Sequence, residues 1–206
     1  MAKIEISRKE RERLQHKQEI MNIALKLFSE MGFHNVSMQQ IAEKSEFAVG
    51  TLYNFFESKE TLFEELINNA SAKTLDEFIE VLDGPGNEKE RLQAFIRHQP
   101  KFLEKHGTIL KLYISEMGMK SPKLYKFSDV NKISEVIDSK LSQIISQGIE
   151  KGIFRSVDAE VAGKTLGSVI ERLILETEGN CDKNTVTDKF RKVEQLFLGG
   201  LLVPQE

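Results

Sequence analysis

The chain has almost no cysteine, no long apolar segment and no signal for export, and each of these shortages excludes a class of protein. Its single cysteine, Cys181, rules out an intramolecular disulfide and any zinc site built from several cysteines. The longest apolar stretches, such as Leu196–Val203, are far shorter than the roughly 20 residues that a membrane-spanning helix needs. The first 13 residues are charged and contain no apolar signal-peptide core. These shortages predict a soluble cytoplasmic protein with no membrane partner.

Catalytic and metal-binding motifs are also missing. Gly163-Lys164-Thr165 resembles the end of a phosphate-binding loop, but the position of the earlier glycine holds Asp158. The four histidines include no pair spaced i, i+4, and none lies beside the cysteine. No Gly-x-Ser-x-Gly sequence is present. We therefore expect no enzyme, no catalytic residue, no metal site and no cofactor, and an α-helical enzyme remains an alternative without a supporting motif.

The spacing of apolar residues is helical throughout. The 206 residues correspond to one or two domains at roughly 150 residues each. One apolar face repeats at helical spacing before the breaker Gly32, through Ile20, Ile23, Ala24, Leu27, Phe28 and Met31. No segment of useful length alternates with period two, so the predicted fold class is all-α.

Capping and breaking residues divide the chain into further helices. Ser37-Met38-Gln39-Gln40 and Ser58-Lys59-Glu60-Thr61 read as capping boxes that open two helices, and a short helix over residues 49–56 lies between them. Residues 83–87 form the strongest breaker. A helix is expected over residues 88–105, kinked or broken at Pro100, and two more over residues 159–178 and 185–202.

Charge is distributed unevenly along the chain. The net charge is −3, which argues against a protein that binds nucleic acid through bulk positive charge. Residues 1–17 nevertheless carry six basic and three acidic side chains, whereas residues 18–66 carry three lysines and eight glutamates. A local basic segment of this kind suits a specific DNA-binding protein. A solvated helix start would have the same composition.

Residues 37–56 predict a helix-turn-helix. Two short helices with a tight connection follow a longer helix that can brace them, and such a unit places the start of its second helix in the DNA major groove. Small residues at 48–51 let the backbone approach DNA, while Tyr53 and Asn54 carry groups that can reach a phosphate or a base edge. The alternative is a plain helical hairpin with both side chains solvated.

The residues of this segment resemble the DNA-binding domain of the tetracycline-repressor (TetR) family. The family pattern of Ile-Ala, then Gly-Thr-Leu-Tyr, then Phe-x-Ser-Lys-Glu-x-Leu is matched at residues 41–42, 50–53 and 56–62. The resemblance covers roughly residues 15–67. It implies an N-terminal arm and three-helix helix-turn-helix domain over residues 1–67, followed by a helical ligand-binding and dimerisation domain over residues 68–206.

The turn before the recognition helix departs from the family pattern. Family members usually have Ala-Gly-Val-Ser there, and this chain has Ser45-Glu46-Phe47-Ala48. Ala48 lacks the hydroxyl that would cap the recognition helix, a loss of about 1 kcal/mol. Glu46 replaces the turn glycine and adds negative charge beside the groove.

The resemblance implies which residues meet DNA. They lie on the second helix, on the recognition helix and at the start of the fourth helix: Ser37, Gln39, Gln40, Ala48, Val49, Thr51, Tyr53, Asn54 and Lys59. The family's lysine at the position of Lys59 meets a phosphate, assisted by the free amides of its helix end. Phe56 matches a buried aromatic that fixes the motif to the first helix, and Phe55 suits either a buried or an exposed position.

The last two helices are the expected dimer interface, because the family forms an intersubunit four-helix bundle there. A small recognition unit gains specificity by reading a two-fold pseudo-palindrome as a dimer. The candidates are small or apolar residues of these helices: Gly163, Gly167, Phe190, Val193 and Phe197. The alternative is that the two glycines pack inside the subunit.

The region between these parts is where the family binds an effector. The candidates for the lining are apolar, adaptable or charged: Phe102, Leu110, Tyr113, Met117 and Arg172. For each of them an ordinary core or surface position is the alternative.

The sequence as a whole predicts a homodimeric transcriptional repressor that binds a palindromic DNA operator. A small apolar or amphipathic effector would bind the C-terminal domain, shift the fourth helix and so change the separation of the two recognition helices. A helical protein–protein adaptor is the alternative class, and it requires that Tyr53→Ala and Lys59→Ala leave function intact.

Overall fold

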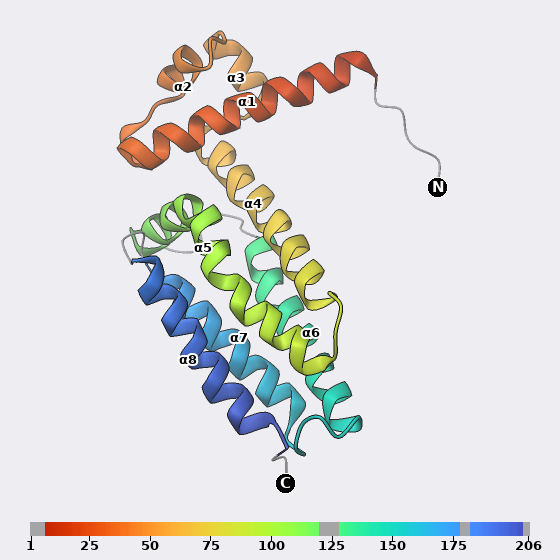
Figure 1. The fold of residues 1–206 in the computed structure, drawn as a ribbon. Helices are drawn as coiled ribbons and strands as arrows, with labels where there is room; N and C mark the ends of the chain where they lie inside the picture. The colour runs from red at the N-terminus through yellow and green to blue at the C-terminus, as the bar shows by residue number, and fades with distance from the viewer. Residues whose placement is uncertain (1–6, 120–127, 178–181, 204–206) are drawn as a thin grey trace. The chain divides into compact units, whose positions relative to one another are not determined.

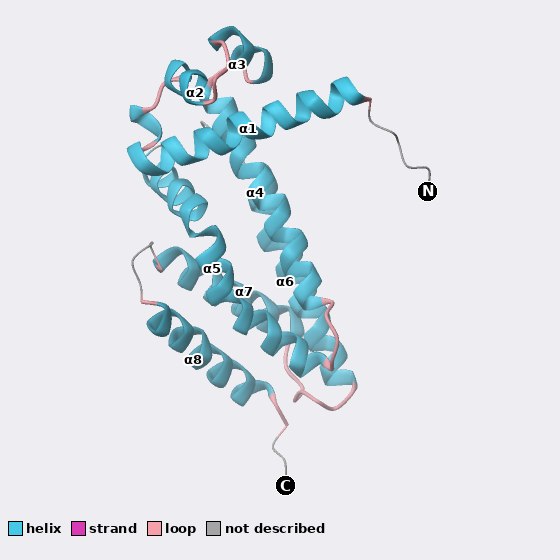
Figure 2. Ribbon diagram, turned by 45° about the horizontal axis from the view of Figure 1, so that its top comes forward, coloured by secondary structure: helices cyan, strands magenta, loops and turns pink. Residues whose placement is uncertain are grey.

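The regular structure of the chain is helical. The computed structural model describes residues 7–119, 128–177 and 182–203, and within these ranges it contains no strand, only an isolated bridge between Phe154 and Leu202 (Figures 1 and 2). The elements are α1 (Arg8–Met31), η1 (Phe33–Asn35), α2 (Met38–Lys44), α3 (Val49–Phe55), α4 (Lys59–Leu82), α5 (Glu88–Met119), α6 (Ser128–Glu150), α7 (Ala159–Glu176) and α8 (Lys183–Leu201). The predicted all-α fold class is confirmed.

The described residues form two compact units. The first comprises the residues up to Ile67 together with 115–119, and the second comprises 68–114, 128–177 and 182–203. The boundary at Ile67 falls inside α4, which therefore contributes residues to both units.

The first unit is built around α1. The side chain of Ser7 accepts a hydrogen bond from the amide of Glu10, so that α1 begins at Arg8, twelve residues before its buried face starts at Ile20. The helix ends at Met31 because Gly32 adopts a positive φ of 81°. Three buried phenylalanines, Phe28, Phe33 and Phe63, pack ring against ring with centroids 4.9–6.0 Å apart. They join α1, η1 and α4 inside this unit.

The second unit has one apolar core to which α4, α5, α6, α7 and α8 all contribute. Here α5 is longer than the expected helix over residues 88–105, because it runs through Pro100 and the following His106-Gly107 to Met119 without a break. Ile96 and Phe102 are buried on either side of Pro100. Their packing maintains the helix across the hydrogen bond that proline cannot donate.

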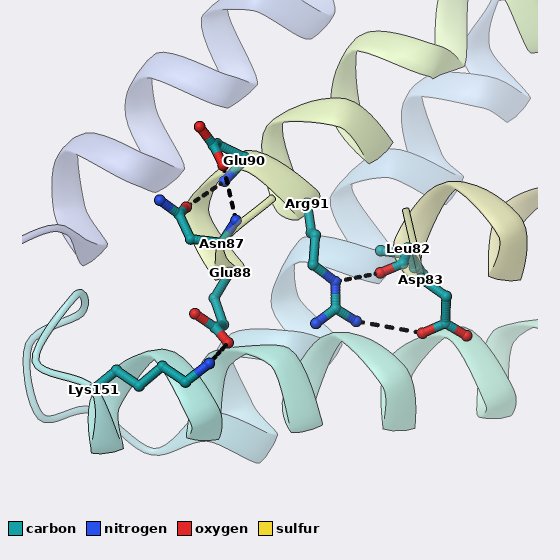
Figure 3. A network of polar contacts seen from close by, with 7 residues as sticks. All are labelled: Leu82, Asp83, Asn87, Glu88, Glu90, Arg91 and Lys151. Carbon is teal, nitrogen blue, oxygen red and sulfur yellow. Dashed lines mark hydrogen bonds and ion pairs between the residues drawn. The ribbon is translucent and has the colours of Figure 1, made fainter. Parts of the chain in front are cut away.

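The turn between α4 and α5 carries its own polar network (Figure 3). Asn87 and Glu90 form a capping box, in which the amide of Asn87 donates to Glu90 Oε2 at 2.8 Å and the amide of Glu90 donates to Asn87 Oδ1 at 3.0 Å. Arg91 Nε donates to the carbonyl of Leu82 at 2.6 Å. These contacts end α4 and start α5 where the breaker over residues 83–87 predicted a turn.

Two lysines of α6 and the segment after it bind the same turn. Lys151 Nζ lies 2.6 Å from Glu88 Oε1, and Lys140 Nζ lies 2.6 Å from Asp83 Oδ1 (the first pair is drawn in Figure 3). The hydrogen bond from Lys151 holds the pKa of the buried Glu88 carboxyl below its ordinary value. The C-terminal end of α4 is thereby fastened to its own unit by ion pairs as well as by the apolar core.

Candidate nucleic-acid interface

The segment α2–turn–α3 is fixed at its start by a complete capping box. The amide of Gln40 donates to Ser37 Oγ at 3.2 Å, and the amide of Ser37 donates to Gln40 Oε1 at 2.8 Å. This confirms the predicted start of α2. The carboxamide oxygen of Gln40 serves the cap, whereas the side chain of Gln39 is exposed.

Glu46 occupies a strained position in the turn. Its φ is 60°, the left-handed region that glycine adopts without strain, and glycine is the residue that Glu46 replaces relative to the TetR pattern. Ser45, before it, is buried and donates from Oγ to the carbonyl of Ile41 at 2.7 Å. Next in the chain, α3 begins at Val49 after Ala48, which has no side-chain oxygen to cap it.

The outward face of α3 carries the expected side chains. Leu52 is fully buried, whereas Tyr53 is 52% exposed. The other candidates on α2 and α3 are exposed or half-buried: Ser37, Gln39, Gln40, Ala48, Val49, Thr51 and Asn54. Since α2 and α3 contact one another, these groups share one helix-turn-helix, with small side chains at the start of α3 and polar ones further along it. Such a face can enter a major groove.

Contacts between α1 and the recognition helix extend this face. The Arg13 guanidinium lies 5.5 Å from the centre of the Phe55 ring, and Lys17 Nζ lies 5.2 Å from that of the buried Phe56. The His16 ring lies 5.1 Å from that of Phe47. Sequence reasoning predicted the burial of Phe56 but missed the partners on α1. The spacing of residues 13, 16, 17 and 20 could have indicated these partners, because it places them on the face on which α1 buries its apolar side chains.

Lys59 does not extend freely into solvent. Its ammonium donates to the carbonyls of Phe33 and Val36 at 2.8 and 2.7 Å and lies 4.4 Å from the centre of the Phe33 ring. The resemblance had placed this lysine on a phosphate. In the structure its charge is directed at the connection between α1 and α2.

The expected effector-lining residues Phe102, Leu110, Tyr113 and Arg172 lie in the second unit, whereas Met117 falls in the stretch 115–119 of the first unit. Phe102 is a buried core residue, Leu110 packs against the same core, and Tyr113 is half-buried with its pKa raised, mainly by burial. Arg172 contradicts the prediction: its side chain is 73% exposed and bonds to Glu176 one turn further along α7. The side chain of Met117 lies outside the described residues.

A charged cluster between α4 and α5 was missed. The carboxylate of Glu77 binds His98 Nε2 and His106 Nε2, each at 3.1 Å, and Lys105 Nζ at 2.7 Å. Burial alone would raise the pKa of Glu77, but the bonds from Lys105 and His106 outweigh it and lower the pKa. Burial also lowers the pKa of His98. Only the i, i+8 spacing of the two histidines on α5 hinted at this cluster in the sequence.

The two glycines proposed for the dimer interface lie inside the subunit. A Cβ at Gly163 would lie 2.6 Å from the amide nitrogen of Ser142 on α6, and one at Gly167 would overlap the carboxylate of Asp138. Phe190 is likewise a buried core residue. Within the single subunit the two glycines serve the close packing of α7 against α6, which was the alternative reading, and Phe190 belongs to the apolar core. Val193 and Phe197 are half-buried at the edge of the core.

Other apolar side chains of α7 and α8 point outward. Leu196 is 81% exposed, Val161 is 61% exposed and Val169 is 40% exposed. The spacing of Val161, Thr165 and Ser168, an uncharged second face of α7, was the signal that could have indicated them. Single exposed apolar residues are common, but three on the two last helices form a candidate association surface.

Within the described ranges, no group of three or more His, Cys, Asp or Glu side chains is arranged to hold a metal ion. No described helix is long and apolar enough to cross a bilayer.

Comparison with known proteins matches this architecture. Residues 20–66 match the family model of bacterial regulatory proteins of the tetR family. The transcriptional repressor KstR2 of Mycobacterium tuberculosis is 27% identical over 139 residues, which are 66% of this chain and 68% of that protein. The transcriptional regulator UidR of Escherichia coli is 40% identical over 65 residues, 32% of this chain and 33% of that protein.

A solved structure extends the likeness of the fold to nearly the whole chain. The regulator FadR of Bacillus subtilis, determined in complex with stearoyl-CoA, superposes with a TM-score of 0.69 at 20% identity, covering 89% of this chain and 98% of FadR. The family consists of DNA-binding regulators and not of enzymes. The helix-turn-helix of residues 20–66 is therefore of the kind found in the tetR family of bacterial regulators.

Proposed function

We propose that this protein is a ligand-responsive transcriptional repressor that acts in the cytoplasm and binds a palindromic operator as a homodimer. The N-terminal unit, residues 1–67, is the DNA-binding part, and residues 68–206 are the effector-binding and dimerisation part. A small apolar or amphipathic molecule releases the operator.

One observation carries the DNA-binding proposal: the exposed face of α3 in a helix-turn-helix whose first helix, α2, begins at a complete capping box. Tyr53 and Asn54 lie on a helix whose opposite side is held by the buried Leu52, so both side chains can meet DNA while the fold stays unchanged. The proposed contacts in addition to these two are Ser37, Gln39, Gln40, Ala48, Val49 and Thr51. The basic residues at the start of α1 supply further contacts with phosphates.

The outward apolar residues of α7 and α8 support the homodimer. Leu196, Val161 and Val169 are exposed in the single subunit and would be buried if these helices met their copies in a second subunit. Gly199, beyond Leu196, has no described atom within 4 Å of where its Cβ would be, so a second backbone could approach there. Val193 and Phe197 border this surface.

The second unit supports binding of an effector with an apolar body. FadR of Bacillus subtilis, which shares the fold, binds stearoyl-CoA. Here the half-buried Leu110 and Tyr113 of α5 are the proposed lining residues. Because α4 contributes residues to both units, an effector that shifts α4 in one unit also acts on the other.

Binding of the purified protein to the DNA upstream of its own gene tests the proposal. Mobility shift and footprinting at two salt concentrations should show protection of a two-fold symmetric site, with affinity falling steeply as salt rises. Addition of stearoyl-CoA as the probe should weaken that binding. Selection from random DNA is the second arm, and purely sequence-independent binding in both arms would favour the protein–protein adaptor.

A charge on the outward face tests the dimer separately. Leu196→Glu should shift the protein from dimer to monomer in sedimentation and weaken operator binding at least tenfold, since a carboxylate would be buried in the interface. Gln195→Glu adds the same charge at the neighbouring exposed position of α8 and is the matched control. A dimer that tolerates Leu196→Glu would assign the interface elsewhere.

A further inference from the structure

Lys59 connects the start of α4 to the segment between α1 and α2. Its ammonium donates to the carbonyl of Phe33, the first residue of η1, at 2.8 Å, and to that of Val36, which follows η1, at 2.7 Å. The ammonium also lies 4.4 Å from the centre of the Phe33 ring, which is itself buried. Three independent contacts thus hold one side chain in a half-buried position.

The electrostatics of the two helix ends explain this arrangement. A cation at the first position of α4 stands at the positive end of that helix, where it is unfavourable unless acceptors are nearby. The segment around η1 supplies them, through the carbonyl of Phe33, at the start of this short helix, and that of Val36, directly after it. The Phe33 carbonyl accepts from the amide of Val36 at 3.4 Å, a weak bond, so that Lys59 is its stronger donor.

Val36 is the residue before the cap of α2. Its side chain is buried, and Ser37 then forms the capping box with Gln40. A bond to the carbonyl of Val36 therefore acts on the peptide plane that joins Val36 to Ser37. This plane sets the direction in which Ser37 and the first amides of α2 face.

We propose that Lys59 is a positioning residue of the DNA-binding unit, which fixes the start of α2 through Phe33 and Val36 and does not bind a phosphate itself. This inference rests on the proposed DNA-binding function. It replaces the phosphate contact that the resemblance implied for Lys59.

Substitution of Lys59 by Gln, with Lys26→Gln as the control, separates the two roles. Lys26 is exposed on α1, so its substitution removes the same charge without touching the connection between α1 and α2. Operator affinity is measured over a series of salt concentrations, and backbone amide signals of residues 33–40 are followed by NMR without DNA. In the unchanged protein, the Lys59 Nζ signal is recorded with and without operator, so that the outcome does not depend on the variant folding.

The expected result for Lys59→Gln is a loss of affinity of about tenfold with the salt slope of the unchanged protein. In Lys59→Gln without DNA, the amide signals of residues 36–40 should shift relative to those of the unchanged protein. Lys26→Gln should show neither the loss of affinity nor these shifts. The Nζ signal of the unchanged protein should be protected before DNA is added and should stay in place afterwards.

A fall of about 0.9 in the magnitude of the salt slope, with unchanged amide signals, would instead make Lys59 a phosphate ligand and overturn the proposal. An Nζ signal that becomes protected only on addition of DNA would do the same. The amide signals and the Nζ signal recorded without DNA need no operator. Failure of the protein to bind any DNA would therefore count against the proposed function alone, whereas unchanged amide signals in Lys59→Gln would still overturn the positioning role.

Discussion

Each of the two units of this protein is stabilised internally by a different kind of contact. In the first unit, the ends of the short elements are set by residues close in sequence: the Ser37–Gln40 cap, the turn at Glu46 and the glycine that ends α1. In the second unit, long helices are fixed by contacts between residues far apart in sequence, such as Gly163 against Ser142 on the neighbouring helix and Arg97 with Glu194. The first arrangement leaves one face available for a ligand, and the second uses most faces for packing.

The largest effect on stability is expected from Gly163→Ala. The added methyl group would lie too close to the backbone of Ser142, so α6 and α7 must move apart, at about 1–3 kcal/mol of unfolding free energy. Calorimetry with hydrogen exchange resolved along the chain should show the loss in α6 and α7.

Gly107→Ala, inside α5, is the matched control, since its Cβ would have no described atom within 4 Å. It should leave stability unchanged or raise it slightly. If Gly163→Ala leaves the free energy of unfolding unchanged but abolishes dimerisation, Gly163 lies in the subunit interface.

In the first unit, Tyr53→Ala should affect binding and not stability. Tyr53 is 52% exposed, so its removal changes little in the core, whereas loss of a DNA contact should lower operator affinity about tenfold, or about 1.4 kcal/mol. Fluorescence titration with operator DNA and thermal unfolding measure the two quantities. Ser29→Ala, at an exposed site on α1, should alter neither, and equal affinities for Tyr53→Ala and the unchanged protein would remove α3 from the interface.

Glu46→Gly should stabilise the first unit. A side chain at a φ of 60° costs about 1 kcal/mol, and glycine relieves that strain while adding some entropy to the unfolded chain. We expect a gain below about 1 kcal/mol in chemical denaturation, with tighter DNA binding because a negative charge is removed. Glu43→Gln removes a charge from an exposed helical position nearby, so a similar gain in that variant would rule out backbone strain as the cause.

The smallest effect is expected from pH, and it should be confined to the second unit. Burial lowers the pKa of His98 from its ordinary 6.5, so the unfolded chain binds the proton more readily than the folded protein. Stability from this group is therefore present above pH 6.5 and lost as the pH falls toward the lower folded pKa. Glu77 binds His98 from α4, and Lys101 and Lys105 act on it from α5.

Unfolding followed at pH 7.5 and 5.5 should show this loss in the unchanged protein, and His98→Gln should reduce it. The first unit serves as the internal reference. If the unchanged protein and His98→Gln lose the same stability between pH 7.5 and pH 5.5, groups other than His98 take up the proton.

The helix-turn-helix could be predicted because its determinants are local. The caps at Ser37 and Ser58 and the breaker at Gly32 mark helix ends with residues that lie within one turn of them. The roles of Lys59 and Arg13 could not be predicted in this way. Each contacts a residue more than 20 positions away, and no local pattern encodes that pairing.

In the second unit the sequence predicted helices but not which face each of them buries. Gly163 and Gly167 were correctly recognised as sites of close helix packing, yet the partner was α6 and not a second subunit. Arg172 was proposed as a lining residue, but its side chain is exposed and forms an ion pair with Glu176 one turn further along the same helix. An amphipathic pattern indicates that a face is buried, and the identity of the covering element depends on tertiary structure.

The uninterrupted course of α4 has a consequence for how the protein unfolds. Its 24 residues form one ladder of backbone hydrogen bonds that passes the boundary at Ile67 without a glycine or proline. Nucleating a helix is unfavourable, whereas extending an existing helix is not. If the part of α4 on one side of Ile67 unfolds, the part on the other side therefore remains helical and frays only at its new end. The amides around Ile67 should therefore exchange more slowly than those of an ordinary linker between domains.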